Sequence, residues 1–458
     1  MGRVKCIATL GPATSDVEVL GRVALYVDGF RINFSHGCED EWSKYIDTIR
    51  SLEDKLRKHF TIIGDLQGPS VRIGLMNTLQ VSSNSIVYFK YCSNCSDGVP
   101  VPNREFFDVI QPGDIVLTDD GRLQLEVKRI NGSGVEALAL TSGFLKRGKV
   151  LVVKGKEYSF PSITEKDYNS LKFAVNKDLD YIAASYVKSP EDIKCIREIL
   201  SKLNSLNVKV IAKIETRMAI LNIDGIINEC DYVLVARGDL GLHFNLEDIP
   251  SIQKLIIDKS IYYGKPVMVA TQLLESMIEN PIPTRAEVVD IYNAVLDGVD
   301  ALLLTGETAV GKYPVEAVKW LRKISEKSDA GLQTINRENL SLESVKDKFA
   351  LGVIRLAEDI NAKVLIYTKT GLTAFRMARF KSKAEIYASS SSLKTIRQLN
   401  ILHNVKPFYV EAKDYEDGLE ISLKKLNELG YVSRGDMVIL TYGLRDTPIH
   451  YVKIISIV

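Results

Sequence analysis

The chain has 458 residues, 46% of them hydrophobic and 26% charged, and its 59 lysines and arginines nearly balance 58 acidic residues, for a net charge of +1. This composition can supply several buried cores and excludes a disordered chain. The near-neutral charge argues against a protein whose main task is the electrostatic capture of nucleic acid or of an anionic membrane.

The lack of recognisable targeting signals and the small number of cysteines narrow the class of protein further. No apolar run approaches the ~20 residues of a membrane span, and the first residues lack the apolar stretch of a signal peptide. Six cysteines are too few for a disulfide scaffold in a chain of this length. We therefore expect a cytoplasmic protein that binds neither nucleic acid nor membrane.

Short apolar runs alternate with amphipathic helical patterns at the start of the chain. The predicted strands are Val4–Leu10, Gly29–Phe34 and Phe60–Leu66. One predicted helix begins near Ser15, an N-cap residue with Glu18 three positions later, and a second covers Glu41–Lys58.

This rhythm stops at Gly68. Residues 68–152 are strand-like and rich in glycine, asparagine and serine, with turn signals at Asp119-Asp120-Gly121 and Asn131-Gly132, which predicts a small all-β module. Within it, Cys92 and Cys95 have the spacing of a zinc or redox pair, but no second pair or nearby histidine completes four ligands. An incidental pair or a disulfide in a polar loop is therefore favoured.

The alternation then resumes and supplies five more strands, which gives eight in all. They are Asp180–Val187, Lys209–Glu215, Asp231–Arg237, Pro266–Thr271 and Asp300–Gly306. Eight parallel βα units close into a (β/α)8 TIM barrel, with an open doubly wound sheet as the structural alternative. Four further strand patterns follow: Lys363–Thr368, Ala384–Ala388, Lys406–Val410 and Met437–Thr441. The predicted domains are a catalytic barrel (1–67 and 153–330), an inserted lid (68–152) and a C-terminal α/β domain (331–458).

Polar residues recur where the predicted barrel strands end, which is the end that carries chemistry in such barrels. They are Arg31, Asn33, Ser35, Asp65, Ser185, Lys213, Glu215, Arg237, Asp239, Thr271, Gln272, Thr305 and Glu307. Any one of them is more often a structural polar residue. Polar residues at seven strand ends together are hard to explain by structure alone.

The chemistry of this set is specific. Glu215 and Asp239 are hard carboxylate ligands suited to Mg²⁺, while Lys213 and Arg31 are cations able to hold phosphoryl oxygens. The backbone of Gly238-Asp239-Leu240-Gly241 at a helix start allows close approach of an anion. Thr271 supplies a hydroxyl for proton relay, and no histidine lies at the strand ends except His36 just beyond one. The set fits phosphoryl transfer or enolate chemistry rather than a histidine-based triad.

Seven stretches of the sequence closely resemble the pyruvate kinase family, in the family's order. They are Arg31–Gly37, Asp65–Pro69, Ile211–Glu215, Val235–Gly241, Ala270–Met277, Pro283–Glu287 and Leu304–Thr308. The resemblance runs from residue 3 to about 320 and weakens toward the end. It implies a barrel with a β-barrel lid inserted after the third strand, a C-terminal regulatory domain, and the reaction of phosphoenolpyruvate with ADP to give pyruvate and ATP.

The resemblance also implies roles for individual residues. Glu215 and Asp239 would bind the catalytic Mg²⁺, with Mn²⁺ as the alternative metal. Lys213 would stabilise the phosphoryl group in flight and Arg31 would hold the phosphate. Gly238, Asp239 and Thr271 would contact phosphoenolpyruvate, with Thr271 helping to deliver the proton. Arg72 matches a nucleotide-contacting arginine, and Lys156, ahead of Pro161, is a looser match to a nucleotide-contacting lysine of the lid hinge.

One departure from the family concerns a monovalent cation. Most members read Asp-Thr-Lys-Gly-Pro-Glu where this chain reads Asp65-Leu66-Gln67-Gly68-Pro69-Ser70. The resemblance implies a K⁺ site from Asn33, Ser35, Asp65 and the Leu66 carbonyl. A glutamate near the cleft makes a compensating K⁺ useful, and Ser70 removes that anion. Our hypothesis is an enzyme that works without K⁺, with structural K⁺ binding as the alternative.

The sequence indicates less about regulation and assembly than about the catalytic chemistry. The loop with Thr368, Thr370, Gly371 and Thr373 lies between a strand and a helix over 374–380, so its hydroxyls and amides could cradle a phosphorylated effector. An ordinary capped turn is the alternative. The segment from Tyr442 to Ile449 is short beside the effector loops of bisphosphate-activated relatives, which argues against fructose 1,6-bisphosphate.

The resemblance implies a homotetramer, with Pro283-Thr284-Arg285 at a subunit contact or Arg285 in an internal ion pair. Two other function classes are the alternatives: a catalytically silent metabolite sensor, and a different Mg²⁺-dependent enolate enzyme. Intact Lys213, Glu215, Asp239, Arg31 and Thr271 argue against the first, and a lid carrying Arg72 argues against the second.

Overall fold

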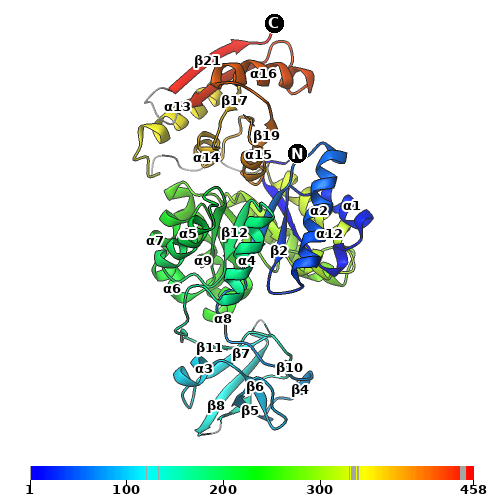
Figure 1. The fold of residues 1–458 in the computed structure, drawn as a ribbon, viewed down its shortest axis with the longest axis vertical. Coiled ribbons are helices and arrows are strands. Elements are labelled where there is room, and N and C mark those ends of the chain that lie inside the picture. Colours follow the sequence, from blue (N-terminus) through cyan, green and yellow to red (C-terminus); the bar gives the residue numbers. More distant parts are fainter. Residues whose placement is uncertain are drawn as a thin grey trace.

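The chain folds into three lobes, shown in Figure 1 with the barrel in the middle, the inserted module below it and the C-terminal domain above it. The computed structural model describes residues 2–119, 121–132, 134–329, 331, 337, 340–443 and 450–458. Among the described helices, none is long and apolar enough to cross a bilayer.

Eight described strands close into a parallel barrel in the order β1-β16-β15-β14-β13-β12-β3-β2. They are β1 (Lys5–Thr9), β2 (Gly29–Asn33), β3 (Thr61–Asp65), β12 (Tyr181–Ala184), β13 (Lys209–Ile214), β14 (Tyr232–Ala236), β15 (Val267–Ala270) and β16 (Ala301–Leu304). The predicted TIM barrel is confirmed, and the open sheet is excluded.

Helices surround the barrel and bury their apolar faces against the strands. They are α1 (Val17–Ala24), α2 (Glu39–Leu56), α4 (Glu165–Asn176), α5 (Pro190–Lys202), α6 (Arg217–Leu221), α7 (Ile223–Glu229), α8 (Arg237–His243), α9 (Ile249–Tyr263), α10 (Arg285–Leu296), α11 (Gly306–Ala309) and α12 (Pro314–Ser328). Short 3₁₀ turns lie at Pro12–Thr14, Leu246–Asp248 and Glu275–Ile278. The predicted Ser15 cap is wrong by one residue: Asp16 accepts the N–H groups of Glu18 and Val19, because its carboxylate reaches the first turn.

The inserted module has its own core and consists mostly of strands. Its elements are β4 (Leu79–Val81), β5 (Ile86–Tyr91), β6 (Val99–Val101), α3 (Arg104–Val109), β7 (Ile115–Thr118), β8 (Leu123–Asn131), β9 (Gly134–Ala139), β10 (Gly143–Leu145) and β11 (Val152–Val153). They form a six-stranded sheet, β11-β7-β8-β9-β5-β6, and a two-stranded sheet, β10-β4. The short helix α3 was not predicted. Cys92 and Cys95 form a disulfide, in line with the disulfide alternative.

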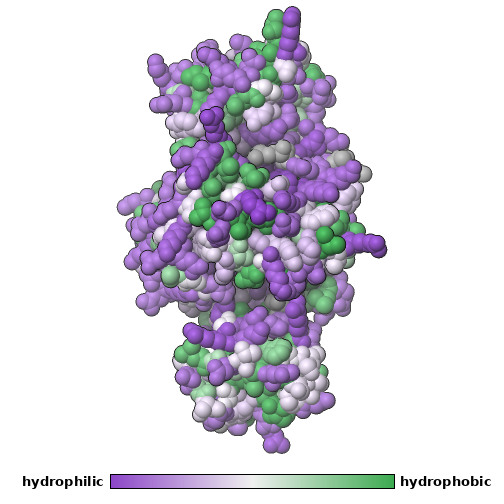
Figure 2. All heavy atoms as spheres, turned by 90° about the vertical axis from the view of Figure 1, so that its right-hand side faces the viewer, coloured by the Kyte–Doolittle hydropathy of each residue, from purple (hydrophilic) through white to green (hydrophobic). Residues whose placement is uncertain are grey.

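The predicted turn at Asn131-Gly132 joins β8 to β9, whereas residue 120 of the other predicted turn lies outside the described residues. Figure 2 shows the surface narrowing between the central and lower lobes. The division of the chain at 67/68, 152/153 and 330/331 remains a prediction, and residue 330 lies outside the described residues.

The C-terminal domain is a five-stranded sheet in the order β19-β18-β17-β20-β21. Its elements are α13 (Val345–Asp359), β17 (Lys363–Tyr367), α14 (Leu372–Ala378), β18 (Ile386–Ser390), α15 (Leu393–Leu399), β19 (Val405–Tyr409), α16 (Tyr415–Glu428), β20 (Met437–Gly443) and β21 (His450–Ser456). The last strand, antiparallel to β20, was not predicted.

This domain closes the end of the barrel where the strands begin. Tyr181 and Tyr232, at the first positions of β12 and β14, donate from inside the barrel to the carbonyl oxygens of Gln398 (2.8 Å) and Ile401 (3.0 Å). The Lys5 ammonium, at the start of β1, donates to the Val405 carbonyl (2.7 Å). Only the opposite end of the barrel, where the strands finish, therefore faces the inserted module.

A buried ion pair ties the last barrel helix to the first barrel units. Arg322 of α12 lies 2.5 Å from Asp28, whose carboxylate also accepts the Cys6 N–H (2.8 Å). Burial alone would raise the pKa of Asp28, but Arg322, Lys5 and Lys58 outweigh it and lower that pKa to about 2. The pair therefore holds α12 against the segment between β1 and β2.

Asp28→Asn should destabilise the fold by about 3–5 kcal/mol, because it leaves the buried Arg322 guanidinium without a counter-charge. A carboxylate with a lowered pKa contributes stability that is complete above its ordinary pKa near 4 and is lost as the pH falls toward 2. Chemical denaturation between pH 2 and pH 7 measures both effects. Equal stability of the two proteins at pH 7, or a difference that does not shrink on acidification, would contradict this account.

Candidate functional site

Charged side chains from three barrel strands, β2, β3 and β13, meet at the open end of the barrel. Arg31 of β2 lies 2.6 Å from Asp65 at the end of β3, and its Nη1 donates to the Thr9 hydroxyl (3.0 Å). The Lys213 ammonium of β13 lies 3.6 Å from Asp65 and 3.2 Å from Glu215. Two cations and two carboxylates predicted from strand ends thus form one connected cluster.

Ser185, at the end of β12, lies inside this cluster. Its hydroxyl accepts from the Lys213 ammonium (2.7 Å) and lies 2.8 Å from the Leu66 carbonyl oxygen. Burial alone would lower the pKa of Lys213, but Asp65 and Glu215 outweigh it and raise that pKa. Lys213 is therefore held as a fixed, protonated ammonium.

Glu215 is the most deeply buried acid of the cluster, with 0% of its surface exposed. Its Oε1 accepts the Tyr186 N–H (2.5 Å), while its buried Oε2 makes no hydrogen bond within the described residues and is the oxygen that pairs with the Lys213 ammonium (3.2 Å). Burial raises the pKa of Glu215 to about 8, against the opposing effect of Lys213. An acid that is costly to ionise is suited to a bound cation, which would favour its charged form.

Asp239, in the first turn of α8, completes a pair of carboxylates. Its negative charge raises the pKa values of both Glu215 and Lys213, so it faces the same space. Within the described ranges, no group of three or more acidic, histidine or cysteine side chains could hold a metal alone. Two carboxylates fit Mg²⁺, which keeps waters and substrate oxygens in its coordination shell.

Thr271 and Gly238 lie beside this pair. The Thr271 hydroxyl accepts the Gly238 N–H (2.8 Å), although Thr271 has the left-handed φ of 71°, an uncommon conformation for a β-branched residue. Arg237 holds this turn: its guanidinium donates to the carbonyl oxygens of Thr271 (2.7 Å) and Gln272 (2.8 Å) and pairs with Asp290 (2.7 Å). Arg237, which the sequence places at the end of a predicted strand, therefore positions Thr271.

Two other residues near the site have structural contacts that the sequence did not indicate. Tyr186 has a φ of 55° and presents its N–H to Glu215, while its phenol interacts with Ser70 of the lid stem. Glu307 is buried and accepts the N–H groups of Leu274 (3.0 Å) and Thr305 (2.7 Å), so it links the segments after β15 and β16. An aromatic residue directly after a strand-end serine was the only signal for Tyr186.

The oxygens of the implied monovalent-cation site already have protein donors. Asn33 Oδ1 accepts the Ser35 N–H (3.1 Å), and Asp65 lies between Arg31 and Lys213. The Lys166 ammonium lies 3.4 Å from the Ser35 carbonyl oxygen and donates to the Gln67 amide oxygen (2.7 Å). The cationic side chains of Arg31, Lys213 and Lys166 therefore lie around the implied cation site.

The two predicted nucleotide-contacting residues differ in position. Arg72 donates to Ser70 (3.0 Å) and to the Gly148 carbonyl (2.9 Å), and it interacts electrostatically with His36 beside β2, whose pKa is lowered by burial and by Arg72. Lys156 instead pairs with Asp114 (2.6 Å) and donates to Val109 within the lid. The structure brings Arg72 toward the barrel mouth but does not bring Lys156 into the cluster.

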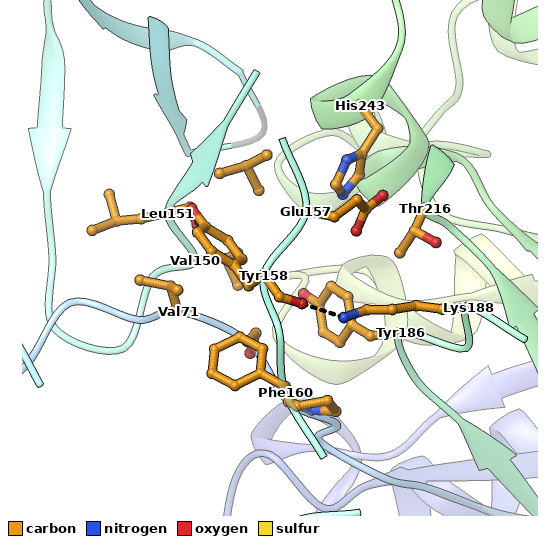
Figure 3. A pocket seen from close by; sticks show the side chains of 13 residues that line it. Val71, Val150, Leu151, Glu157, Tyr158, Phe160, Tyr186, Lys188, Thr216 and His243 are labelled. Atoms are coloured by element: carbon orange, nitrogen blue, oxygen red, sulfur yellow. Dashed lines mark hydrogen bonds between the residues drawn. The ribbon is translucent and has the colours of Figure 1, made fainter. Parts of the chain in front are cut away.

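The lid and barrel meet at a small cavity of about 20 Å³ beside the site (Figure 3). Glu157 and His243 face it, and Lys188 reaches across to the Tyr158 carbonyl oxygen (2.5 Å). Leu242 packs against Leu117 and Val152 of the lid. Helix α8 therefore carries Asp239 at one end and lid contacts at the other.

The predicted effector loop is a tight, capped turn. The buried Thr368 hydroxyl accepts the Gly371 N–H (2.9 Å), and Gly371 has a left-handed φ of 80°. Thr370 is exposed and Thr373 is half-buried, beside Gly443. In the segment from Tyr442 to Ile449, whose shortness argues against fructose 1,6-bisphosphate, residues 444–449 lie outside the described residues.

Comparisons with known proteins match the whole chain. The family model "Pyruvate kinase, barrel domain" matches residues 1–318, and "Pyruvate kinase, alpha/beta domain" matches residues 347–455. A pyruvate kinase of Pyrobaculum aerophilum is 38% identical over 98% of this chain and 96% of its own length. A pyruvate kinase of Aeropyrum pernix is 37% identical over 99% and 98%, and one of Thermotoga maritima is 36% identical over 97% of each.

A solved structure is equally similar. The crystal structure of pyruvate kinase from Pyrobaculum aerophilum superposes with a TM-score of 0.89 at 38% identity, covering 99% of each chain. The barrel, the inserted sheets and the C-terminal domain thus agree with an experimental structure of a relative.

Gly68→Ala should destabilise the site. Gly68 has a φ of 67°, and an added Cβ would lie 2.8 Å from the Ser185 Cβ and 2.9 Å from the Ser185 carbonyl oxygen. Gly155→Ala is the matched control, because Gly155 has a φ of 78° with nothing within 4 Å of an added Cβ. Backbone strain alone costs about 1 kcal/mol, so thermal unfolding should show a larger loss for Gly68→Ala. An equal loss in both variants would show that Ser185 is not tightly packed.

Proposed function

The chain belongs to the pyruvate kinase family and is an enzyme with that activity, and we propose how its side chains carry out the reaction. The connected cluster of Arg31, Asp65, Lys213 and Glu215 at the barrel mouth is the observation that supports the assignment most. In the proposed reaction, the phosphoryl group of phosphoenolpyruvate passes to ADP, giving pyruvate and ATP.

Arg31 and Lys213 are proposed to hold the transferring phosphoryl group. Asp65 and Thr9 fix the Arg31 guanidinium, and Ser185, Asp65 and Glu215 fix the Lys213 ammonium. Both cations are thereby oriented before substrate arrives, and preorganised charge stabilises a transition state without reorganisation. The raised pKa of Lys213 keeps it protonated throughout.

Glu215 and Asp239 are proposed as the protein ligands of a divalent cation, Mg²⁺ or Mn²⁺. The burial of Glu215, which raises its pKa to about 8, supports this assignment, because a bound cation would favour the charged carboxylate. When bound, the ion would neutralise charge on the phosphoryl and enolate oxygens. Such nearby positive charge would favour the charged form of Glu215, whose pKa is raised by burial, so cation binding is coupled to the order of the site.

Thr271 and the start of α8 are proposed to bind and protonate the three-carbon unit. The backbone at Gly238 and Asp239 would contact the substrate carboxylate, which requires the Gly238 N–H to leave the Thr271 hydroxyl that it binds here (2.8 Å). The Thr271 hydroxyl would help deliver the proton to the enolate carbon. The clamp of Arg237 on the Thr271 carbonyl oxygen supports a role that needs this hydroxyl in a fixed place.

Arg72 is proposed to contact the nucleotide, since it lies on the lid stem close enough to lower the pKa of His36 beside β2. The ion pair of Lys156 with Asp114 supports a structural role in the lid, and a nucleotide contact would require that pair to open. On family membership we also propose a cytoplasmic homotetramer with Pro283-Thr284-Arg285 at a subunit contact, and a phosphorylated effector at Thr368, Thr370, Gly371 and Thr373. Sedimentation of the purified enzyme tests the tetramer.

Lys213→Ala should lower turnover by about 10²–10³ or more, because a preorganised charge at the transition state is removed. The fold should persist, since the site is one end of a barrel whose core lies elsewhere. A coupled assay for ATP formed from phosphoenolpyruvate and ADP measures turnover, and circular dichroism measures the fold. Near-normal phosphoryl transfer by a folded variant would refute the assignment.

We propose further that the enzyme needs no K⁺. Ser70 carries no charge, and Arg31, Lys213 and Lys166 already supply positive charge around Asn33, Ser35, Asp65 and Leu66. Turnover in buffer free of sodium and potassium should therefore match turnover with added K⁺. Ser70→Glu, which restores the family's glutamate, should create a K⁺ requirement. Strict K⁺ dependence of the unmodified enzyme would refute the proposal, and K⁺-dependent stability without K⁺-dependent turnover would support structural binding only.

A further inference from the structure

A second polar cavity lies far from the barrel mouth, where the barrel meets the C-terminal domain. Its volume is about 260 Å³, far above the ~10–15 Å³ that one water occupies. Lys209 at the start of β13 and Lys265 before β15 line it from the barrel, while Phe375 and Arg376 of α14 and Arg379 just after it line it from the other domain. Small-molecule sites favour such domain interfaces.

Two of its cations have no carboxylate partner within the described part of the chain. Arg379 is only 6% exposed and donates to the carbonyl oxygens of Tyr262 (2.7 Å) and Ser341 (3.1 Å), while its buried Nε has no partner there. Lys265 donates only to the carbonyl oxygens of Asn228 (3.1 Å) and Cys230 (2.7 Å). A charge held by neutral acceptors alone leaves a positive potential in the cavity.

The acidic residues of the lining are already engaged. Asp231 pairs with Arg197 (2.9 Å) and Lys209 (3.7 Å). Asp347 pairs with Arg376 (3.2 Å) and also caps α13 through Ser344. The third lining acid, Glu343, accepts from Ser341 (3.0 Å). Four cationic side chains line the cavity against three carboxylates that already have partners. The excess of positive charge favours the binding of an anion.

The cavity also has an apolar side. Phe375 and Leu372 line it from α14, and the Lys209 ammonium lies 4.6 Å from the centre of the Phe375 ring. Arginine and lysine together with an aromatic wall suit a phosphate group attached to a planar or apolar body, because the guanidinium fork matches phosphate oxygens.

We propose that this cavity binds a small phosphorylated metabolite, with the phosphate near Lys265 and Arg376 and the remaining body against Phe375. Such a ligand would join the barrel to the C-terminal domain, since each supplies part of the site. It would touch the starts of β13 and β15, whose other ends carry Lys213 and Thr271. The site is separate from the loop at Thr368, although α14 connects the two.

Isothermal titration of the full chain, without divalent metal or substrate, tests the proposal with two probes, inorganic phosphate and phenyl phosphate. Phenyl phosphate should bind more tightly than phosphate. A variant combining Lys265→Met with Arg376→Gln should weaken the binding of both probes by about a hundredfold or more, because one charge-assisted hydrogen bond is lost at each position. Phe375→Leu should reduce only the preference for phenyl phosphate.

Two further variants assign the binding to this cavity. Lys213→Ala weakens any probe binding at the barrel mouth, and Thr368→Val weakens any binding at the loop before α14. Both variants should keep the phenyl phosphate binding that the Lys265/Arg376 variant loses. Arg379 is left intact because it packs on Gly264, and circular dichroism confirms that each variant is folded. The proposal is overturned if phenyl phosphate does not bind. It is equally overturned if binding is lost in Lys213→Ala or Thr368→Val, or survives unchanged in the folded Lys265/Arg376 variant.

Discussion

The site depends on one buried ammonium held between two carboxylates. Lys213 lies 3.2 Å from Glu215 and 3.6 Å from Asp65; both carboxylates are buried, and the side chain of Lys213 is only 12% exposed. The opposite charges reduce one another's free-energy cost of burial, because an isolated buried charge is costly. Arg31 balances the remaining negative charge on Asp65. The protein therefore carries, before any ligand arrives, the charge pattern that a phosphoryl group in transfer requires.

The rest of the fold keeps these strand ends in register. The opposite end of the barrel is sealed by the C-terminal domain, whose carbonyl oxygens accept the hydroxyls of Tyr181 and Tyr232. Arg322 and Asp28 fasten the last helix to the first strands. Chemistry and interdomain packing thus occupy opposite ends of the same strands, and the interdomain cavity at Lys209 and Lys265 lies at the packing end.

Helix α8 links Asp239, a proposed metal ligand, to the lid. Asp239 lies in its first turn and Leu242 in its last, packed against Leu117 and Val152. Helix α8 has seven residues, so a displacement of the lid at Leu242 would also move Asp239. Tyr186 forms a second link, because its N–H binds Glu215 and its phenol faces Ser70. Lid position and the state of the carboxylate pair are therefore physically connected.

The sequence alone determined the barrel, the place of the insertion and the chemistry of the strand ends. Alternation of apolar strands with amphipathic helices is a local signal, and parallel closure then places Arg31, Asp65, Lys213 and Glu215 at one end. Only the tertiary structure decided which partner each side chain has. Lys156 pairs with Asp114 inside the lid, and Arg237 holds Thr271 in a left-handed conformation. These outcomes, like the antiparallel β21 and the cavity beside Arg379, depend on contacts between distant segments, which local patterns of hydrophobicity do not encode.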